Sequence, residues 1–262
     1  MNNNHPNAIP LCFSNLSSDN ILTQLKKTSS LIIPLCTLEP YGTSIPLGIN
    51  ALCMDSIASE VAARLSLLKA PALHYGVSGR YKAFAGSIGL KPKQFSAMLE
   101  SICNDCFFQG FKQVILLNSS EENVLALELL LKRYNNQIGK ILIFSMHSDT
   151  IVREFLEKTF FVKDVDRSEF MMLSIASYLD ETITKPAEGA TVKQLDLKRY
   201  MQWKRRGRDP ETFKKKFPCG VMTETAGLSS AQAGKVLHEF IVNLLCERYS
   251  QLSGKKDDNA TS

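Results

Sequence analysis

Short apolar runs that alternate with longer helical patterns set the strongest limit on how this chain folds. Residues 113–117, Gln-Val-Ile-Leu-Leu, are the clearest buried strand, and residues 30–35 form an apolar run that ends at a proline-bounded turn. Two more strands are expected, at residues 71–75 and 140–145. Apolar residues at helical spacing predict the intervening helices, at residues 54–68, 94–109 and 124–135.

This order of strand, loop and helix predicts an α/β fold with a mainly parallel sheet. Ligands bind at the carboxyl ends of the strands in such sheets. The loops that follow Leu35 and Leu117 are therefore the places where we expect chemistry.

The C-terminal half is less regular. Residues 169–179 fit either a strand or a helix, whereas residues 229–250 predict an amphipathic helix with Ser229 or Ser230 as its N-cap. Hydrophobic residues make up 44% and charged residues 22% of the 262, which excludes a chain that is disordered throughout. We expect an N-terminal tail, one domain and a disordered C-terminal tail, at residues 1–25, 26–250 and 251–262.

The cysteines and the apolar runs indicate a cytoplasmic protein. No run approaches the roughly 18 apolar residues of a membrane span, and no secretory signal is recognised at the N-terminus. Seven cysteines, an odd number with apolar neighbours, favour reduced and buried thiols. Cys103 and Cys106 form a C-x-x-C inside a predicted helix, where a packed helix face is preferred over a metal or redox site.

The positive charge of the chain is concentrated in one segment. Residues 193–216 hold ten basic and three acidic residues, which leaves −2 of the total charge of +5 for the rest. Tyr200, Trp203 and Phe213 lie among them, a composition found in nucleic-acid patches. A solvated loop or an interface to an acidic partner is the preferred interpretation, and binding to nucleic acid is the alternative.

Four segments, in sequence order, resemble the creatininase (creatinine amidohydrolase) family. Residues 34–47, PLCTLEPYGTSIPL, resemble the family pattern P-x-G-S-x-E-x-H-G-x-H-L-P-L. Residues 75–88 begin with YGVS and end with FAGSI, similar to Y-G-x-S and F-P-G-T-I. Residues 110–123 run from GFKQVILLN to Glu-Asn, and Cys219-Gly220-Val221 resembles part of the last family segment. The order holds over more than four-fifths of the chain.

The resemblance implies a three-layer α/β/α sandwich and oligomers, hexamers or dimers. It also implies two divalent metals, Zn or Mn, that activate a water for the hydrolysis of a cyclic amide. Two family ligand positions are kept, as Glu39 and Glu122. The other three are changed: the two histidines are Tyr41 and Ser120, and the bridging aspartate is Asn50.

Other family positions are changed as well. The Glu-His pair after Y-G-x-S is Arg80-Tyr81, and none of the four histidines falls on a ligand or catalytic position. We therefore expect no metal cofactor, and Tyr41, Asn50, Arg80, Tyr81 and Ser120 become candidate substrate-binding residues.

Three hypotheses for function follow. The leading one is a non-catalytic binding or assembly subunit that has lost the metal site. The first alternative is a metal-independent enzyme for a small amide or amine, with Glu39, Glu122 and Cys36 as candidate catalytic residues. In it, one carboxylate with a raised pKa is an acid, or Cys36 is a nucleophile that His74 or Arg80 activates. A salt bridge of Arg80 with both carboxylates, and Cys36 as an apolar filler, are the preferred interpretations. The second alternative is nucleic-acid binding through residues 193–216.

The partners that we expect follow from these hypotheses. A homo-oligomer is expected, with a protein partner or an active homologue and a small-molecule ligand as further candidates. Neither a membrane nor nucleic acid is expected as the main partner.

Overall fold

The computed structural model describes residues 11–42, 45–134, 139–162, 167–183, 209–221 and 229–253. Five parallel strands form one sheet in the order β1-β3-β2-β4-β5. The strands are β1 (Leu11–Cys12), β2 (Ser30–Leu35), β3 (Leu68–Lys69), β4 (Gln113–Asn118) and β5 (Lys140–Ser145).

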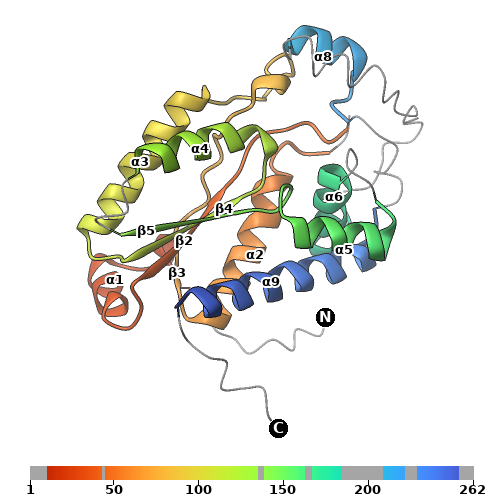
Figure 1. Cartoon of the computed structure of the whole chain (residues 1–262). Helices are drawn as coiled ribbons and strands as arrows, with labels where there is room; N and C mark the ends of the chain where they lie inside the picture. The colour runs from red at the N-terminus through yellow and green to blue at the C-terminus, as the bar shows by residue number, and fades with distance from the viewer. Residues whose placement is uncertain are drawn as a thin grey trace.

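Helices cover both faces of the sheet (Figure 1). One layer holds α1 (Ser18–Leu25), α3 (Pro92–Phe108) and α4 (Val124–Arg133). The other holds α2 (Ile49–Leu65), α5 (Thr150–Phe160), α6 (Arg167–Leu179) and α9 (Ala231–Ser253). Side chains alternate along the strands, so that Ile32 and Ile115 pack in the second layer while Leu31 and Val114 pack in the first. The prediction of a three-layer α/β fold with a parallel sheet is confirmed.

The central strands end in register, which places the functional loops. Leu35 of β2 lies opposite Asn118 of β4, and Asn118 lies opposite Ser145 of β5. The loop after β2 and the loop after β4 therefore leave the sheet side by side. A 3-10 turn, η2 (Gly79–Tyr81), and another, η3 (Glu121–Asn123), complete this edge.

Several predicted elements differ from the observed ones. The strand predicted at residues 71–75 is wrong: β3 is Leu68–Lys69, and Leu73 makes only an isolated bridge to Leu35. Helix α2 begins at Ile49 rather than at residue 54. Ile49 and Asn50 in its first turn are buried in the fold. The ambiguous residues 169–179 are helical, as α6, and they are buried on nearly all sides, which removes the periodicity that would have decided between helix and strand.

The ends of the chain also carry more structure than expected. Residues 11–25, predicted as tail, form β1 and α1, and Leu11, Ile21 and Leu25 pack against the first layer. Helix α9 reaches Ser253, three residues into the predicted C-terminal tail. Ser230 caps it, because its Oγ accepts a hydrogen bond from the N–H of Ala233 at 3.1 Å. The domain boundaries themselves stay predictions.

Cys103 and Cys106 lie on the buried face of α3, as predicted for a packed helix face. Burial raises the pKa of Cys103 to about 12 and that of Cys106 to about 11. Within the described residues, no helix is long and apolar enough to cross a bilayer.

The crossing of α6 and α9 generates a prediction about stability. A Cβ on Gly234 of α9 would lie 1.8 Å from the carbonyl oxygen of Ser174 in α6. Gly234→Ala should therefore lower the free energy of unfolding by about 1–3 kcal/mol in a urea titration. Ala is intrinsically preferred over Gly in a helix by about 1 kcal/mol, so a loss of stability in this variant must come from the packing of the two helices.

Gly48→Ala is the matched control, because no atom lies within 4 Å of a Cβ at Gly48. It should change stability by no more than about 0.5 kcal/mol. Equal effects of the two substitutions would contradict the close crossing of α6 and α9.

Candidate functional site

Three of the predicted site residues, Tyr41, Asn50 and Ser120, lie around the carboxylate of a fourth, Glu39, in the loop after β2. Oε1 accepts hydrogen bonds from Thr37 Oγ1 at 2.7 Å and from Ser120 Oγ at 2.5 Å. The hydroxyl of Tyr41 lies 3.3 Å from Oε2 and donates to Asn50 Oδ1 at 2.8 Å. Asn50 Nδ2 in turn donates to Thr37 Oγ1 at 3.1 Å. These five residues are called the Glu39 cluster.

The Glu39 cluster is closed to solvent. Glu39 is 4% exposed, Ser120 2%, and Asn50 of α2 is fully buried. A buried carboxylate is stable only when its oxygens are hydrogen-bonded or paired with a charge. The hydroxyl groups of Thr37, Tyr41 and Ser120 fill that need, and the last two stand at positions where the resemblance places family metal ligands.

The second carboxylate, Glu122 in η3, is paired with Arg80 in η2. Arg80 Nε donates to Glu122 Oε1 at 2.8 Å, and the main-chain N–H of Arg80 lies 3.3 Å from Oε2. Both side chains are less than 10% exposed. Glu121 lies 3.7 Å from the guanidinium, at the outer side. The Arg80–Glu122 pair is thus a buried ion pair.

Ser120 joins this pair to the Glu39 cluster. Its Oγ donates to Glu39 and accepts from the main-chain N–H of Glu122 at 3.1 Å. Arg80 is therefore near both carboxylates but is hydrogen-bonded to Glu122 alone among them. A salt bridge of Arg80 with both, one of the sequence interpretations, is not what the distances show.

Two tyrosines line the site, and their pKa values are raised. Burial, and then the charge of Glu39, raises the pKa of Tyr41 well above its ordinary value. Burial also raises the pKa of Tyr81, against the opposing effect of Arg80, whose guanidinium lies 5.3 Å from the Tyr81 ring centre. Burial alone would lower the pKa of Arg80, but Tyr81 and Glu122 raise it above its usual range. Both phenols stay protonated and Arg80 stays charged.

Cys36 lies next to the site but does not face it as a reactive thiol. Its side chain is fully buried, and its Sγ lies 3.8 Å from the carbonyl oxygen of Asn50. Burial, followed by the charge of Asp55, raises the pKa of Cys36 far above that of an ordinary thiol. A nucleophilic cysteine needs the opposite shift. His74, the suggested base, is exposed.

Two asparagines hold the loop after β4 in place. Asn118 Nδ2 donates to the carbonyl oxygen of Ser120 at 2.8 Å, and its Oδ1 accepts from Asn123 Nδ2 at 2.9 Å. Asn123 Oδ1 accepts from the N–H of Val77 at 2.7 Å. Gly76 is required beside it, because a Cβ there would lie 2.5 Å from Asn123 Oδ1. Ser120 and Glu122 are therefore fixed relative to η2.

Sequence reasoning gave no role to Thr37, His147 or Glu169, which all lie at this edge. His147 follows β5, its Nε2 is hydrogen-bonded to the carbonyl oxygen of Ser119, and its Nδ1 is buried without a partner in the described part of the chain. Glu169 in the first turn of α6 is 4% exposed and contributes to the raised pKa of Tyr81. The parallel topology was the available signal for His147, since it follows a strand at this edge.

The basic segment touches the site through one short helix, α8 (Pro210–Lys216). Phe213 is fully buried, 5.6 Å from Tyr81 between ring centres and 5.0 Å from Phe217. Lys214 Nζ donates to the carbonyl oxygen of Ala83 at 2.8 Å. Tyr200 and Trp203 lie outside the described residues, so nucleic-acid binding stays a prediction.

The residues present do not fit a dinuclear metal site. Zinc and manganese sites use imidazole and carboxylate ligands, and a pair of ions needs a bridging carboxylate. Here the cluster offers one carboxylate, whose Oε1 already accepts two hydroxyl protons. Within the described residues, no group of three or more His, Cys, Asp or Glu side chains is placed to hold a metal ion.

Removing Arg80 should destabilise the protein strongly. Arg80→Met leaves Glu122 buried without its partner, which should cost about 3–5 kcal/mol of unfolding free energy in urea titrations. Arg80→Met combined with Glu122→Met should recover most of this loss, because no unpaired charge remains. Arg64→Met is the control: its pair with Glu60 is 39% exposed on the arginine side and should be worth less than about 1 kcal/mol. A cost for Arg80→Met as small as for Arg64→Met would contradict the buried pair.

Alkaline pH should also destabilise the fold. The pKa values of Cys36, Cys53, Tyr41 and Tyr81 are all raised by burial, so the folded state keeps protons that the unfolded chain loses above about pH 8.5 for thiols and about pH 10 for phenols. The contribution of these groups to the free energy of unfolding is therefore fully present below about pH 8.5. It falls as the pH rises, by up to about 1.4 kcal/mol per pH unit for each group.

Urea titrations at a series of pH values measure this slope. Cys36→Ala with Cys53→Ala should flatten the slope between about pH 9 and about pH 10. A wild-type slope of zero in this range would show that the thiols are not buried.

Comparisons with known proteins agree with this architecture. Residues 14–249 match the family model "Creatininase: Creatinine amidohydrolase". A creatinine amidohydrolase (creatininase) crystal structure superposes with a TM-score of 0.69 at 18% identity, over 92% of this chain and 97% of that one. A structure described as "Creatininase Mn" gives a TM-score of 0.67 at 17% identity, over 92% and 98%.

Two curated relatives match shorter parts of the chain. The mycofactocin precursor peptide peptidase of Mycobacterium tuberculosis (strain CDC 1551 / Oshkosh) is 34% identical over 88 residues, 29% of this chain and 35% of the relative. The creatinine amidohydrolase of Pseudomonas putida is 24% identical over 98 residues, 36% of this chain and 38% of the relative. The matches thus span little more than a third of either relative. Because the family model covers nearly the whole chain, this protein belongs to the creatinine amidohydrolase family.

Proposed function

We propose that this family member is a non-catalytic binding or assembly subunit in which the dinuclear metal site has been replaced by the Glu39 cluster. The observation that carries this proposal is the engagement of Glu39 by Thr37 and Ser120, at 2.7 and 2.5 Å. A metal ion would have to displace hydroxyl donors that already satisfy this oxygen.

The charge balance supports the same proposal. Two divalent ions would supply about four positive charges to the site, whereas the carboxylates at the two kept family positions, Glu39 and Glu122, are already compensated within the chain. The guanidinium of Arg80 offsets Glu122 directly, and neutral donors offset Glu39. Added metals would therefore meet two carboxylates that already have partners, and no imidazole at the positions where the resemblance places ligands.

The alternative of a metal-independent enzyme needs a group that is free to react. Both carboxylates are engaged by donors of the chain, and the thiol of Cys36 is held protonated by burial. Two relatives are named a creatinine amidohydrolase and a precursor peptide peptidase. Creatinine and small peptides are accordingly the substrates with which to test for residual hydrolysis.

Metal content per chain tests the proposal. The protein is expressed with added zinc and manganese, dialysed, and analysed for bound metal and for hydrolysis of creatinine and of a peptide. We expect well under one metal ion per chain and no turnover above the buffer rate. Two ions per chain, or turnover that a chelator abolishes, would overturn the proposal.

Restoring the family ligands provides the positive control. A variant with Tyr41→His, Asn50→Asp and Ser120→His regains the imidazoles and the bridging carboxylate that the resemblance implies, and it should bind metal. Adding Glu39→Gln to that variant should reduce the bound metal by roughly 10-fold or more. If the restored variant binds no more metal than the wild type, residues other than these three positions decide the absence of metal.

A further inference from the structure

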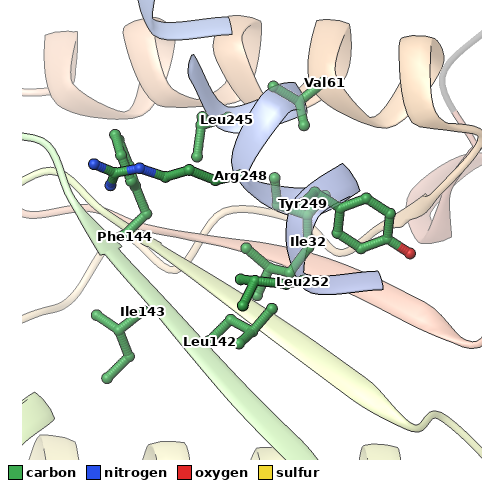
Figure 2. A pocket seen from close by; sticks show the side chains of 10 residues that line it. Ile32, Val61, Leu142, Ile143, Phe144, Leu245, Arg248, Tyr249 and Leu252 are labelled. Atoms are coloured by element: carbon green, nitrogen blue, oxygen red, sulfur yellow. The ribbon is translucent and has the colours of Figure 1, made fainter. Parts of the chain in front are cut away.

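An apolar pocket lies between the sheet and the last turns of α9 (Figure 2). Three strands provide its floor, because Ile32 of β2 is in register with Ile115 of β4, and Ile115 is in register with Leu142 of β5. Val61 of α2 and Leu245 of α9 also line it. The volume of this pocket, which is called the α9 pocket, is about 70 Å³.

Two of the lining residues carry polar groups, and both direct them away from the α9 pocket. The hydroxyl of Tyr249 donates to Ser30 Oγ at 3.0 Å. The guanidinium of Arg248 is paired with Asp149 and lies 5.2 Å from the centre of the Phe144 ring. In Figure 2 both groups point away from the floor strands. The wall of the pocket is therefore apolar, although two of its residues are not.

Water gains little in the α9 pocket. A buried water typically makes about three hydrogen bonds to polar groups of the protein, and a void with apolar walls stays dry. Among the described lining side chains, the two polar groups that water would need are turned elsewhere and bonded. An apolar group that enters the pocket therefore displaces no firmly bound water, and it gains the dispersion contacts that the walls lack.

The volume sets the size of the occupant. A cavity of about 150 Å³ with apolar walls holds one benzene molecule, which is about 25 Å³ for each carbon atom. The 70 Å³ of the α9 pocket thus correspond to about three carbon atoms. Pockets that hold a whole drug-sized ligand measure about 300–1,000 Å³. Leu252 lines the pocket and is 50% exposed, so the rest of a ligand can extend into solvent on that side.

The charges beside the pocket favour an uncharged ligand. Asp149, the partner of Arg248, caps α5: its Oδ1 accepts hydrogen bonds from the N–H groups of Ile151 and Val152 at 2.9 and 3.1 Å. A ligand carboxylate would have to compete for Arg248 with an aspartate that α5 holds in place. The guanidinium is therefore a poor anchor for an acid.

The sequence after α9 offers no apolar group of the right size. Residues 254–262 are Gly-Lys-Lys-Asp-Asp-Asn-Ala-Thr-Ser, in which only Ala260 has an apolar side chain. Its single methyl group is smaller than the about three carbon atoms that the pocket takes. A small molecule fits the volume and the apolar wall better than this segment does.

We propose that the α9 pocket binds the alkyl end of a small uncharged molecule, with about three carbon atoms enclosed and the polar remainder in solvent. The floor residues Ile32, Ile115 and Leu142 are each the third of six residues in their strands. The pocket therefore lies away from the loop edge that holds the Glu39 cluster. This inference goes beyond the proposed function and does not depend on the loss of the metal site.

A series of straight-chain alcohols from ethanol to hexanol tests the size of the enclosed part. Binding to the full chain is followed by NMR through the methyl groups of Val61, Leu142 and Leu245, with dissociation constants expected in the millimolar range for so few atoms. Each CH₂ that enters the pocket should tighten binding by about 4-fold. Beyond about butanol, the gain should fall below about 2-fold per CH₂.

Two results of this series would overturn the proposal. One is a gain that continues unchanged to hexanol, which indicates binding to open apolar surface rather than to an enclosed pocket. The other is the absence of any shift in the three sets of methyl signals at saturating alcohol concentration.

Two variants change the pocket in opposite directions. Leu142→Phe places a ring over the floor and should weaken butanol binding by at least about 10-fold. Val61→Ala removes two carbon atoms from the wall and should move the end of the 4-fold gains to longer alcohols, by one or two carbon atoms. Because each variant is read by its own ligand series, either one decides the proposal if the other does not fold.

Leu125→Phe is the matched control, because it makes the same substitution at a 53% exposed leucine of α4. It should leave butanol binding unchanged. Equal binding by the wild type, Leu142→Phe and Leu125→Phe, with all three folded by circular dichroism, would show that the alcohols bind elsewhere and would overturn the proposal.

Butanoate and butanol, which have the same number of carbon atoms, test the charge of the ligand. Butanoate should bind no more tightly than butanol, because Arg248 is already paired. Butanoate binding that is about 10-fold tighter, and that Arg248→Met reduces to the level of butanol, would show that the pocket selects an acid and would overturn the uncharged class.

Discussion

The burial of one carboxylate, that of Glu39, governs the arrangement of the whole loop edge. A charge that is 4% exposed must be satisfied by nearby donors, and these come from two loops: Thr37 and Tyr41 on its own loop, and Ser120 after β4. Asn50 of α2 is bonded to Tyr41 and Thr37. Each donor is held by a further bond, as Ser120 is by the amide of Glu122. The loops are therefore fixed relative to one another by the needs of a single side chain.

The charged part of the site depends on this arrangement. Ser120 orients Glu122, Glu122 holds Arg80, and Arg80 lies against Tyr81. Tyr81 contacts Phe213, so the short helix α8 rests on the same structure through aromatic packing. A substitution of Glu39 should consequently alter the packing of α8, although no hydrogen bond joins the two directly.

The sequence predicts more of the fold than of the hydrogen bonds in the site. Apolar runs and helical spacing were enough for β2, β4 and β5, because buried strands and amphipathic helices carry their signal locally. The identity of β3 depended on Leu68 and Lys69 pairing with distant strands, which no local pattern encodes. Family resemblance brought Glu39, Tyr41, Asn50 and Ser120 together, but not the partners of each hydrogen bond. Thr37 was missed because a single threonine carries no signal until its distance to a carboxylate is known.

The proposal for the site depends on whether its polar groups already have hydrogen-bond partners. In the Glu39 cluster, the carboxylate, the amide of Asn50 and the hydroxyls of Thr37, Tyr41 and Ser120 all have partners within the chain. Such a cluster has little to gain from a metal ion. The proposed loss of the metal site rests on this internal satisfaction of its polar groups.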